Sequence, residues 1–362
     1  TGLPVDDLFS IADADELLSR RGLRTPFLRM AADGRVLPTG RFTGPGGAGA
    51  GVADQVRDDA VLSLFADGAT VVLQGLHRLW GPIRDLAADL ADELGHPVQV
   101  NAYITPPQSQ GFDPHYDTHD VFVLQVAGRK HWRVHAPVLV DPMPDQPWGQ
   151  IGDAVAARAA EEPRLDTVLT PGDCLYLPRG FIHSATALAE ISLHLTFGIH
   201  NVTQRDVVSA ALDELRARGW ESTLPVGWDP RGDLSGIREL MAEAAARLSA
   251  LDPATVAERM LARRAAAQRP EPVAPLATVQ AAARLTADSR VRLRRHLVAW
   301  LDQQVLRVGD THRVDVTLAQ IPAVELLLPG KPQRVGDLPG EDPVGLVARL
   351  MREGVVVLTE DD

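Results

Sequence analysis

A chain of 362 residues is longer than a usual single domain, so two or three domains with at least one sizeable core are expected. The formal net charge of -12 opposes nonspecific binding to nucleic acids and anionic membranes and suits a basic partner. The one cysteine, Cys174, excludes an internal disulfide and fits a reducing cytoplasm, and no run of about 18 apolar residues could cross a membrane.

The first 95 residues mix short helical patterns with one strand pattern. The N-terminus, TGLPVDDLFS, has neither the basic start nor the apolar stretch of a secretory signal, and the missing initiator methionine suggests a trimmed chain. The glycine-rich loop at 44–52 lacks the Gly-Lys-Ser/Thr sequence of a phosphate-binding loop, which predicts a flexible surface connection. An apolar stretch, ATVVLQGL at 69–76, precedes GPIRDLAADLADELG at 81–95, where apolar residues recur at helical spacing.

Residues 98–200 follow the period of two that is typical of strands. In EISLHLTFGI at 190–199, Ile191, Leu193, Leu195 and Phe197 share one face. The stretch TVLTPGDCLYLP at 167–178 indicates two strands joined in a hairpin by a Pro-Gly-Asp turn. Further strands are expected in VQVNAYI at 98–104 and DVFVLQV at 120–126. Short antiparallel strands with Gly/Pro turns predict a sandwich or barrel, and the fold class expected for the whole chain is α+β.

The chain becomes helical after residue 200. Thr203 is a plausible N-cap with Asp206 in the first helical turn, and Asp252 is a second cap followed by Pro253. The segment QRPEPVAP at 268–275 indicates a linker. The remainder, roughly 276–362, mixes helix and strand patterns and ends in a helix that runs through a glycine into a strand, which is compatible with a winged-helix module.

Metal-binding residue types concentrate in the strand-rich region. Seven of the eleven histidines lie between residues 115 and 200. Residues i and i+2 of a strand face the same way, so His115 and Asp117 project together. A later histidine, for which His183 is the best candidate at the turn after the hairpin, would complete a 2-His-1-carboxylate triad for non-haem iron(II). An isolated His-x-Asp pair is more often a surface pair, but the sequence PRGFIHSA in a β context favours the triad.

Residues 98–200 resemble the JmjC-type cupin domain, a double-stranded β-helix, of the ribosomal oxygenases, which depend on iron(II) and 2-oxoglutarate. The segments NAYITPPQSQGFDPHYDTHDVFVLQVAGRKHWRV and GDCLYLPRGFIHSA carry the resemblance, together with SLHLTFG. It implies an oxygenase domain at 1–202, a helical dimerisation domain at 203–270 and a winged-helix-like domain at 276–362. It also implies that His115, Asp117 and His183 hold Fe(II), and that O2 binds beside 2-oxoglutarate.

The co-substrate 2-oxoglutarate needs a fixed cation for its distal carboxylate. Lys130 fits this need because it shares strand parity with Trp132 and Val134, whereas Arg129 and His131 take the other face. The resemblance assigns Lys130 to that carboxylate, and it places Asn101 and Thr196 in the same pocket. The alternatives are a solvated strand lysine and ordinary polar residues of a barrel.

Several further residues are candidates for the pocket or its entrance. His194 lies on the pocket face, but the resemblance uses the histidine of GFIH as the ligand, so His194 is expected in the pocket wall. The proline-rich loop at 137–153 could edge the entrance or be a surface loop. The other possible pocket residues are Tyr103, Tyr116, Arg179 and, in that loop, Trp148. The histidines expected at the surface or in strand packing are His119, His131 and His135.

The resemblance implies hydroxylation of an arginine or histidine side chain of a ribosomal protein. The alternatives are a peptide or small-molecule hydroxylase of specialised metabolism, a cupin that does not use 2-oxoglutarate, and a ligand-sensing transcription regulator. A DNA-binding winged helix should be basic, yet residues 271–362 hold eleven Lys/Arg against thirteen Asp/Glu, so no direct DNA binding is expected. Apolar stripes at 203–267, such as Val207, Ala211 and Leu215, predict a homodimer through these helices.

Overall fold

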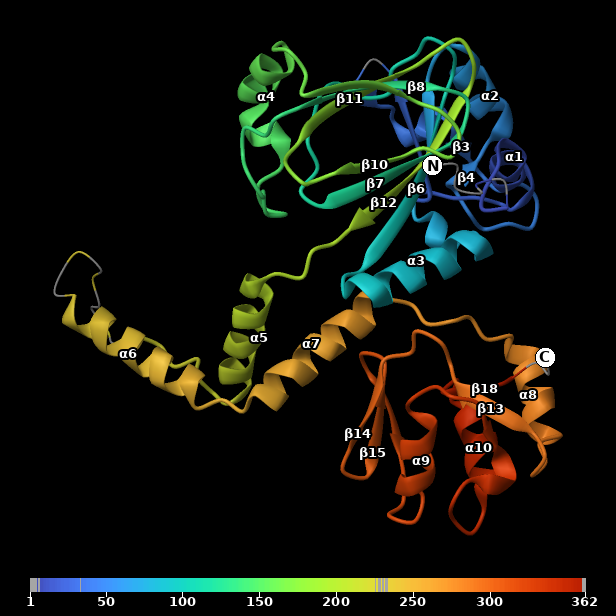
Figure 1. The fold of residues 1–362 in the computed structure, drawn as a ribbon, viewed down its shortest axis with the longest axis vertical. Coiled ribbons are helices and arrows are strands. Elements are labelled where there is room, and N and C mark those ends of the chain that lie inside the picture. Colours follow the sequence, from blue (N-terminus) through green and yellow to red (C-terminus); the bar gives the residue numbers. More distant parts are fainter. Residues whose placement is uncertain are drawn as a thin grey trace. The chain divides into compact units, whose positions relative to one another are not determined.

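The computed structural model describes residues 5, 7–32, 34–224, 226, 229, 231 and 234–359. The chain divides into two compact units, Thr1–Asn201 and Val202–Asp362. Figure 1 shows a strand-rich first unit, drawn from blue to green, and a second unit that begins with three helices. None of the helices in the described ranges is long and apolar enough to cross a membrane.

The first unit is built on a seven-stranded antiparallel sheet. Its alternating sequence buries Leu193, Leu195 and Phe197 on one face, as their spacing predicts, in a core that also includes Leu17 and Ile83. The helices on this face are α1 (Ile11–Arg20), α2 (Asp58–Ala66) and α3 (Gly81–Leu94). The strands, in sheet order, are β10 (Cys174–Leu177), β7 (Asp120–Ala127), β12 (Ser192–Ile199), β6 (Val98–Thr105), β5 (Thr70–Leu73), β1 (Leu28–Ala32) and β2 (Arg35–Val36).

A three-stranded sheet packs on the other face and completes the double-stranded β-helix. Its order is β11 (Ile182–Ala187), β8 (Lys130–His135) and β9 (Leu165–Leu169). Val121 and Val123 of the large sheet join Trp132 and Val134 of the small one in a shared apolar cluster. A short pair, β3 (Thr43–Gly44) and β4 (Gln55–Val56), encloses the glycine-rich loop, which is largely exposed. The space that remains between the two main sheets is where the predicted metal ligands and Lys130 lie.

Two features of this unit differ from the sequence-based expectations. The strands on either side of the Pro-Gly-Asp turn exist, but they form no hairpin: β9 pairs with β8 and β10 pairs with β7, so the turn carries the chain from one sheet to the other. The proline-rich loop ends in a 3-10 turn, Trp148–Ile151, and then in helix α4 (Gly152–Ala159), which was not predicted. Val155 of α4 is buried against Tyr116 and Ile182, so this segment packs on the barrel.

The second unit begins with three helices, α5 (Gln204–Ala217), α6 (Ser235–Ser249) and α7 (Pro253–Ala267). The predicted caps are confirmed: Thr203 and Asp206 form a capping box at α5, and the Asp252 side chain accepts a hydrogen bond from Ala254 N at α7. Helix α5 buries Ala210 and Leu215, whereas α6 and α7 bury none of their described residues.

The C-terminal part has a core of its own, formed by residues between Ala282 and Val356. The predicted passage from a helix through a glycine into a strand is confirmed, because α10 (Pro343–Arg352) is followed by Gly354 and then β18 (Val356–Leu358). The winged-helix-like assignment stays a prediction. Three helices and two three-stranded sheets make up this part: α8 (Pro275–Ala283), α9 (Ile321–Leu327), α10 (Pro343–Arg352), β17 (Gln333–Arg334), β13 (Arg290–Leu293), β18 (Val356–Leu358), β14 (Ala299–Asp302), β15 (Val305–Val308) and β16 (His312–Asp315).

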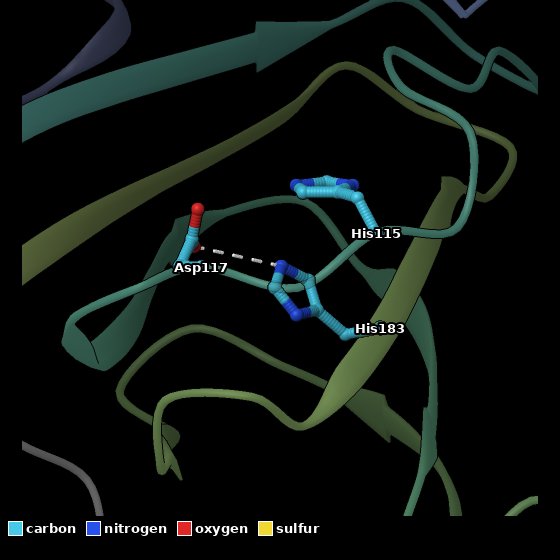
Figure 2. Close-up of side chains that lie close together, drawn as sticks. All are labelled: His115, Asp117 and His183. Atoms are coloured by element: carbon cyan, nitrogen blue, oxygen red, sulfur yellow. Dashed lines mark ion pairs between the residues drawn. The ribbon is translucent and has the colours of Figure 1, made fainter. Parts of the chain in front are cut away.

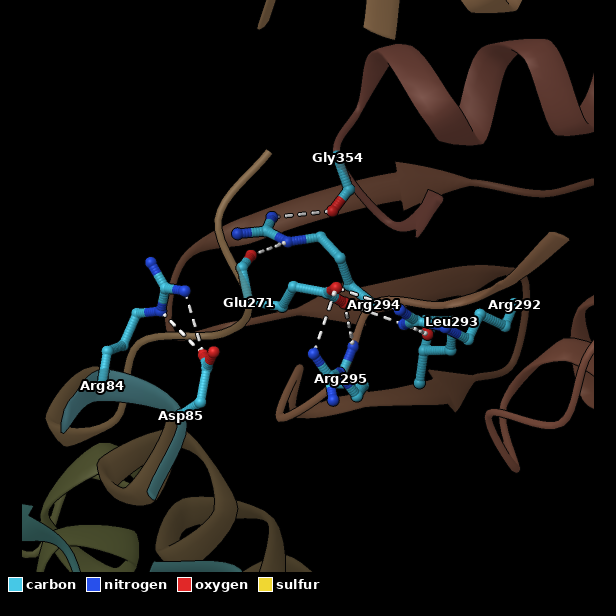
Figure 3. A network of polar contacts seen from close by, with 8 residues as sticks. All are labelled: Arg84, Asp85, Glu271, Arg292, Leu293, Arg294, Arg295 and Gly354. Carbon is cyan, nitrogen blue, oxygen red and sulfur yellow. Dashed lines mark hydrogen bonds and ion pairs between the residues drawn. The ribbon is translucent and has the colours of Figure 1, made fainter. Parts of the chain in front are cut away.

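The segment predicted as a linker is fastened to this core by Glu271 (Figure 3). Its carboxylate accepts two hydrogen bonds from the Arg292 guanidinium, at 2.8 and 2.9 Å, and one from Arg295 N at 3.0 Å. Arg294 donates to the Glu271 carbonyl at 2.6 Å and to the Gly354 carbonyl at 2.8 Å. The hydrogen bonds from Arg292 lower the pKa of Glu271 to about 2. A bidentate pair of this kind fixes position as well as charge.

Replacing Glu271 with glutamine is expected to lower the free energy of unfolding at neutral pH by about 1–3 kcal/mol, because the arginine loses a charged acceptor. The folded-state pKa lies below the ordinary 4.5, so this stabilisation is present above pH 4.5 and is lost as the pH falls toward 2. Urea unfolding followed at several pH values measures both effects. Glu341→Gln, at an exposed position, is the control, and an equal loss in both variants would contradict the assignment.

Candidate active site

The three predicted metal ligands meet between the two sheets of the first unit. His115 and Asp117 lie in an extended segment between β6 and β7 rather than in a strand, and His183 is the second residue of β11 rather than part of a turn. A single antiparallel bridge joins the two segments: His115 N donates to the His183 carbonyl at 3.2 Å, and His183 N donates to the His115 carbonyl at 2.8 Å. This bridge holds the two imidazoles side by side.

Their side chains form a compact donor set (Figure 2). One ligand atom from each of His115, Asp117 and His183 lies within 4.8 Å of the others. The ring centroids of the histidines are 4.5 Å apart, and His183 Nε2 lies 3.8 Å from an Asp117 carboxylate oxygen. Two imidazole nitrogens and one carboxylate are the donors of a facial triad, which leaves coordination positions open. The residues therefore fit a non-haem iron(II) ion.

Backbone carbonyls set the orientation of both histidines. His115 Nδ1 lies 2.7 Å from the Asp113 carbonyl, and His183 Nδ1 lies 3.1 Å from the Phe181 carbonyl. A carbonyl oxygen can only accept a hydrogen bond, so each Nδ1 carries the hydrogen and each Nε2 presents a lone pair. This is the arrangement in which a histidine binds a metal through Nε2.

The charges of the cluster also suit a cation. Burial lowers the pKa of His183 to about 4, so the imidazole is neutral at pH 7, as a ligand must be. Burial alone would raise the pKa of Asp117, but the neighbouring His183 and His115 outweigh that effect and hold it below the ordinary value. The site therefore offers a carboxylate and, at His183, a neutral imidazole at neutral pH.

A cavity of about 60 Å³ extends from this cluster between the sheets. Both sheets and the extended segment contribute to its wall. The lining includes four of the residues singled out beside the triad, namely Lys130, Thr196, Tyr103 and His194. It also includes Thr70, Gly111, Phe112, Val121, Val123, Trp132, Leu177, Ser184 and Ala185.

Lys130 is a buried cation without an acidic partner in the described part of the chain. Its side chain is on the inner face of β8 with Trp132 and Val134, as its parity predicts, and Nζ donates to Thr105 Oγ1 at 3.0 Å. Burial lowers its pKa to about 7. In the unfolded chain the amine keeps its proton up to a pH of about 10.5, whereas in the folded protein it loses it near pH 7. The burial of Lys130 therefore lowers the free energy of unfolding at neutral pH. An anionic ligand would offset that cost.

A polar row crosses the large sheet beside Lys130. Gln125, His194 and Tyr103 are in register on β7, β12 and β6, and the rings of Tyr103 and His194 stack at a centroid distance of 5.0 Å. Nδ1 of His194 is buried and has no hydrogen-bond partner among the described residues. Burial raises the pKa of Tyr103 to about 12, so its hydroxyl keeps its proton and remains able to donate. The row leaves polar groups on the cavity wall.

Four other predicted residues do not line the cavity. Asn101 is beside Thr196 in the sheet register, but its side-chain oxygen accepts from Gly75 N at 3.0 Å. Tyr116 is buried, and its hydroxyl donates to the Gln146 carbonyl. Arg179 lies 3.5 Å from an Asp141 carboxylate oxygen. Trp148 is half-exposed, and its ring lies 6.3 Å from that of His115.

The three histidines expected at the surface or in strand packing lie outside the triad. His119 stacks on His200 at a centroid distance of 5.1 Å, and His131 contacts the Asp166 carboxylate. His135 is buried at the end of β8. None of the three lines the cavity.

Thr105 and Phe112, which lie beside Lys130 and His115 respectively, were missed by the sequence analysis. Thr105, which contacts Lys130, shares strand parity with Asn101 and Tyr103, so the period of two could have identified it. Phe112 lies in an irregular segment, with its ring 5.9 Å from that of His115. Only its closeness in sequence to His115 could have suggested it.

Together, the two facing sheets and the His-Asp-His cluster define a cupin-type double-stranded β-helix protein with a metal-binding donor set. Residues 78–207 match the model of the JmjC domain family. The predicted family resemblance and the α+β fold with a double-stranded β-helix core are confirmed, whereas the dimerisation segment and the winged helix stay predictions. Helix α3 and the start of α5 fall inside the matched range, together with all three candidate ligands.

Curated relatives share this part of the chain. Human ribosomal oxygenase 1 is 34% identical over 200 residues, which are 53% of this chain and 28% of that protein. The bifunctional lysine-specific demethylase and histidyl-hydroxylase NO66 of Drosophila persimilis is 42% identical over 119 residues, which are 33% of this chain and 16% of that protein. The matched part is thus less than a third of the length of either relative.

Solved structures extend the likeness to nearly the whole chain. The Escherichia coli ribosomal oxygenase YcfD has a TM-score of 0.56 at 19% identity, and the match covers 98% of this chain and 91% of that one. A second structure of YcfD, in complex with cobalt and 2-oxoglutarate, has a TM-score of 0.53 at 18% identity. At these identities the comparison shows a shared fold.

Proposed function

We propose that this protein is an oxygenase that depends on iron(II) and 2-oxoglutarate and hydroxylates a protein side chain. The observation that carries the proposal is that one cavity holds both a His-Asp-His donor set and a buried lysine with no acidic partner among the described residues. The donor set and the lysine are both needed for this assignment, because a set of metal ligands alone would suit many kinds of reaction. The relatives are named as oxygenases, and the similar structure of YcfD holds 2-oxoglutarate.

Each group has a defined task in this proposal. His115, Asp117 and His183 would hold the iron, and Lys130 would bind the distal carboxylate of 2-oxoglutarate with help from Thr105. When bound, iron and 2-oxoglutarate supply the oxidising power that converts O2 and 2-oxoglutarate to succinate, carbon dioxide and a hydroxylated substrate carbon. The apolar walls exclude water, and the fixed imidazoles keep positions open on one side.

The roles of the remaining predicted pocket residues follow from their positions. Thr196 lines the cavity and is proposed to contact 2-oxoglutarate, while Asn101 is proposed to support that strand from the same face. Tyr103 and His194 are proposed as wall residues that offer hydrogen bonds. These assignments rest on position in the sheet.

We further propose that the substrate is an arginine or histidine side chain of a ribosomal protein. Two observations support this choice: the similarity to proteins named ribosomal oxygenases, and a net charge of -12, which would attract basic ribosomal proteins. We place the reaction in the cytoplasm, where Cys174, which is exposed, would stay reduced. The C-terminal part, with its excess of acidic residues, is proposed to contact protein rather than DNA.

Mass spectrometry of ribosomal proteins tests the substrate. Cells that contain the gene are expected to show an added oxygen on one arginine or histidine, and cells without it are expected to lack this modification. Complementation with wild type should restore the modification, whereas Asp117→Ala should not, because the donor set is incomplete. Unmodified ribosomal proteins in both kinds of cell would reject this substrate class while leaving 2-oxoglutarate turnover to be measured separately.

We also propose that α5, α6 and α7 form a two-fold dimer interface. Helix α6 buries none of its own side chains, and Met241 is 67% exposed; Val208 of α5 is 54% exposed. Exposed apolar side chains gathered on neighbouring helices are typical of an association surface. Light scattering at micromolar concentration is expected to give twice the chain mass of 39.0 kDa. A mass of one chain would contradict the dimer and leave the oxygenase proposal intact.

A further inference from the structure

A second cavity of the first unit shares no lining residue with the candidate active site. It measures about 690 Å³ and lies between α1 and α2, the two blue helices on one side of the unit in Figure 1. Ile11 and Leu18 of α1 and Leu62 and Phe65 of α2 form its sides, and Val71 of β5 is part of its floor. This cavity is called the α1–α2 groove below.

The groove exists because α2 is apolar on two faces. Val61 and Leu64 are buried in the core, while Leu62 and Phe65, also three positions apart, point along the groove. A helix that packs only on its own core carries polar residues on the other side. Leu62 instead leaves 69% of its surface exposed. An apolar face of this kind, set in a groove, indicates a binding surface.

The rim of the groove is acidic. Asp15 of α1 and Asp58 and Asp59 of α2 line it, and no basic residue of the described ranges does. Asp59 pairs with Arg57, whereas Asp15 and Asp58 form no ion pair with any residue in the described ranges. A negative rim around an apolar floor selects for a ligand with the opposite pattern.

We propose that the α1–α2 groove binds a basic amphipathic helix of a protein partner. The apolar positions of such a helix would fill the groove, and its lysines or arginines would meet the Asp15 and Asp58 carboxylates. A second copy of this chain fits poorly, because a two-fold interface would bring the same carboxylates against each other in a protein of net charge -12. The proposal does not depend on the oxygenase activity.

Fluorescence anisotropy on the intact protein tests the proposal. The probe is a labelled synthetic peptide with leucines at helical spacing and lysines on the opposite face. Leu62→Ser should weaken its binding roughly tenfold, because the substitution removes an apolar contact. Asp15→Lys should weaken it by a similar factor and reduce the dependence on salt, because a carboxylate on the rim becomes a cation. A scrambled peptide of the same composition should bind weakly to all variants.

Matched controls separate the groove from the general surface. Val140, at 70% exposure, is as accessible as Leu62 and lies outside the groove, so Val140→Ser should leave binding within about twofold of wild type. Glu162→Lys, at an exposed position outside the groove, is the charge control. Peptide binding that is absent, or equal in all four variants, would overturn the proposal. A fall in the mass of the protein on Leu62→Ser would overturn it too, because a second copy would then occupy the groove.

Discussion

Asp117→Ala is expected to reduce 2-oxoglutarate turnover to below about a hundredth of the wild-type rate. Losing a direct metal ligand should cost more activity than losing a residue that only hydrogen-bonds to a ligand. The substitution leaves two imidazoles and no carboxylate in the donor set to hold a divalent cation. Succinate release, measured with added iron(II) and ascorbate, reports the rate. Binding of the metal alone, followed by calorimetry, should weaken in parallel.

The variant should keep its fold, because Asp117 lies in an extended segment and its side chain is not part of an apolar core. Circular dichroism and thermal unfolding check this point. Asp153→Ala removes an exposed carboxylate from the first turn of α4 and should retain full turnover. Normal turnover by a folded, metal-checked Asp117 variant would show that the triad is not the catalytic site.

Lys130→Met is expected to weaken 2-oxoglutarate binding by on the order of 2 kcal/mol, about thirtyfold in Kd, because the distal carboxylate loses its cation in a buried cavity. Methionine keeps much of the side-chain volume, so the cavity wall should persist. Thr105 Oγ1 would lose its contact with the amine. Calorimetry with 2-oxoglutarate measures the change directly.

The pH dependence of binding gives a second readout for Lys130. With a pKa of about 7, the free lysine is largely neutral above this pH and must take up a proton to pair with the ligand. Wild-type affinity should therefore fall as pH rises above 7, by up to about tenfold per unit, and Lys130→Met should lack this dependence. Lys331 is exposed, and Lys331→Met should behave like wild type. Equal Kd values in all three proteins would assign the distal carboxylate to another residue.

The sequence predicted the parts of the fold that depend on local patterns. The alternation in 190–199 correctly placed Leu193 and Leu195 in the core, and the parity of Lys130 placed it on the inner face. Pairing between distant strands is not encoded locally, which is why β9 and β10 were expected in one hairpin although they belong to different sheets. Helix α4 was missed because prolines dominate the segment that precedes it.

The candidate site was likewise predicted only in part. His115, Asp117 and His183 were identified from residue types and from a family resemblance, and they do come together. The backbone bridge that joins His115 to His183 could not be foreseen, because it forms between an irregular segment and a strand 68 positions later in the chain. Phe112 was missed for the same reason: an irregular segment has no period from which the direction of a side chain can be inferred.

The two carbonyl contacts of the ligand histidines have a consequence for how such a protein can diversify. Each Nδ1 is held by the carbonyl of the residue two positions earlier, Asp113 for His115 and Phe181 for His183. Main-chain groups survive any change of side chain, so the cavity wall can vary in size and polarity while the imidazoles keep their direction. Recognition of a new substrate and retention of the metal are thus separable traits, and mutations that explore one need not erode the other.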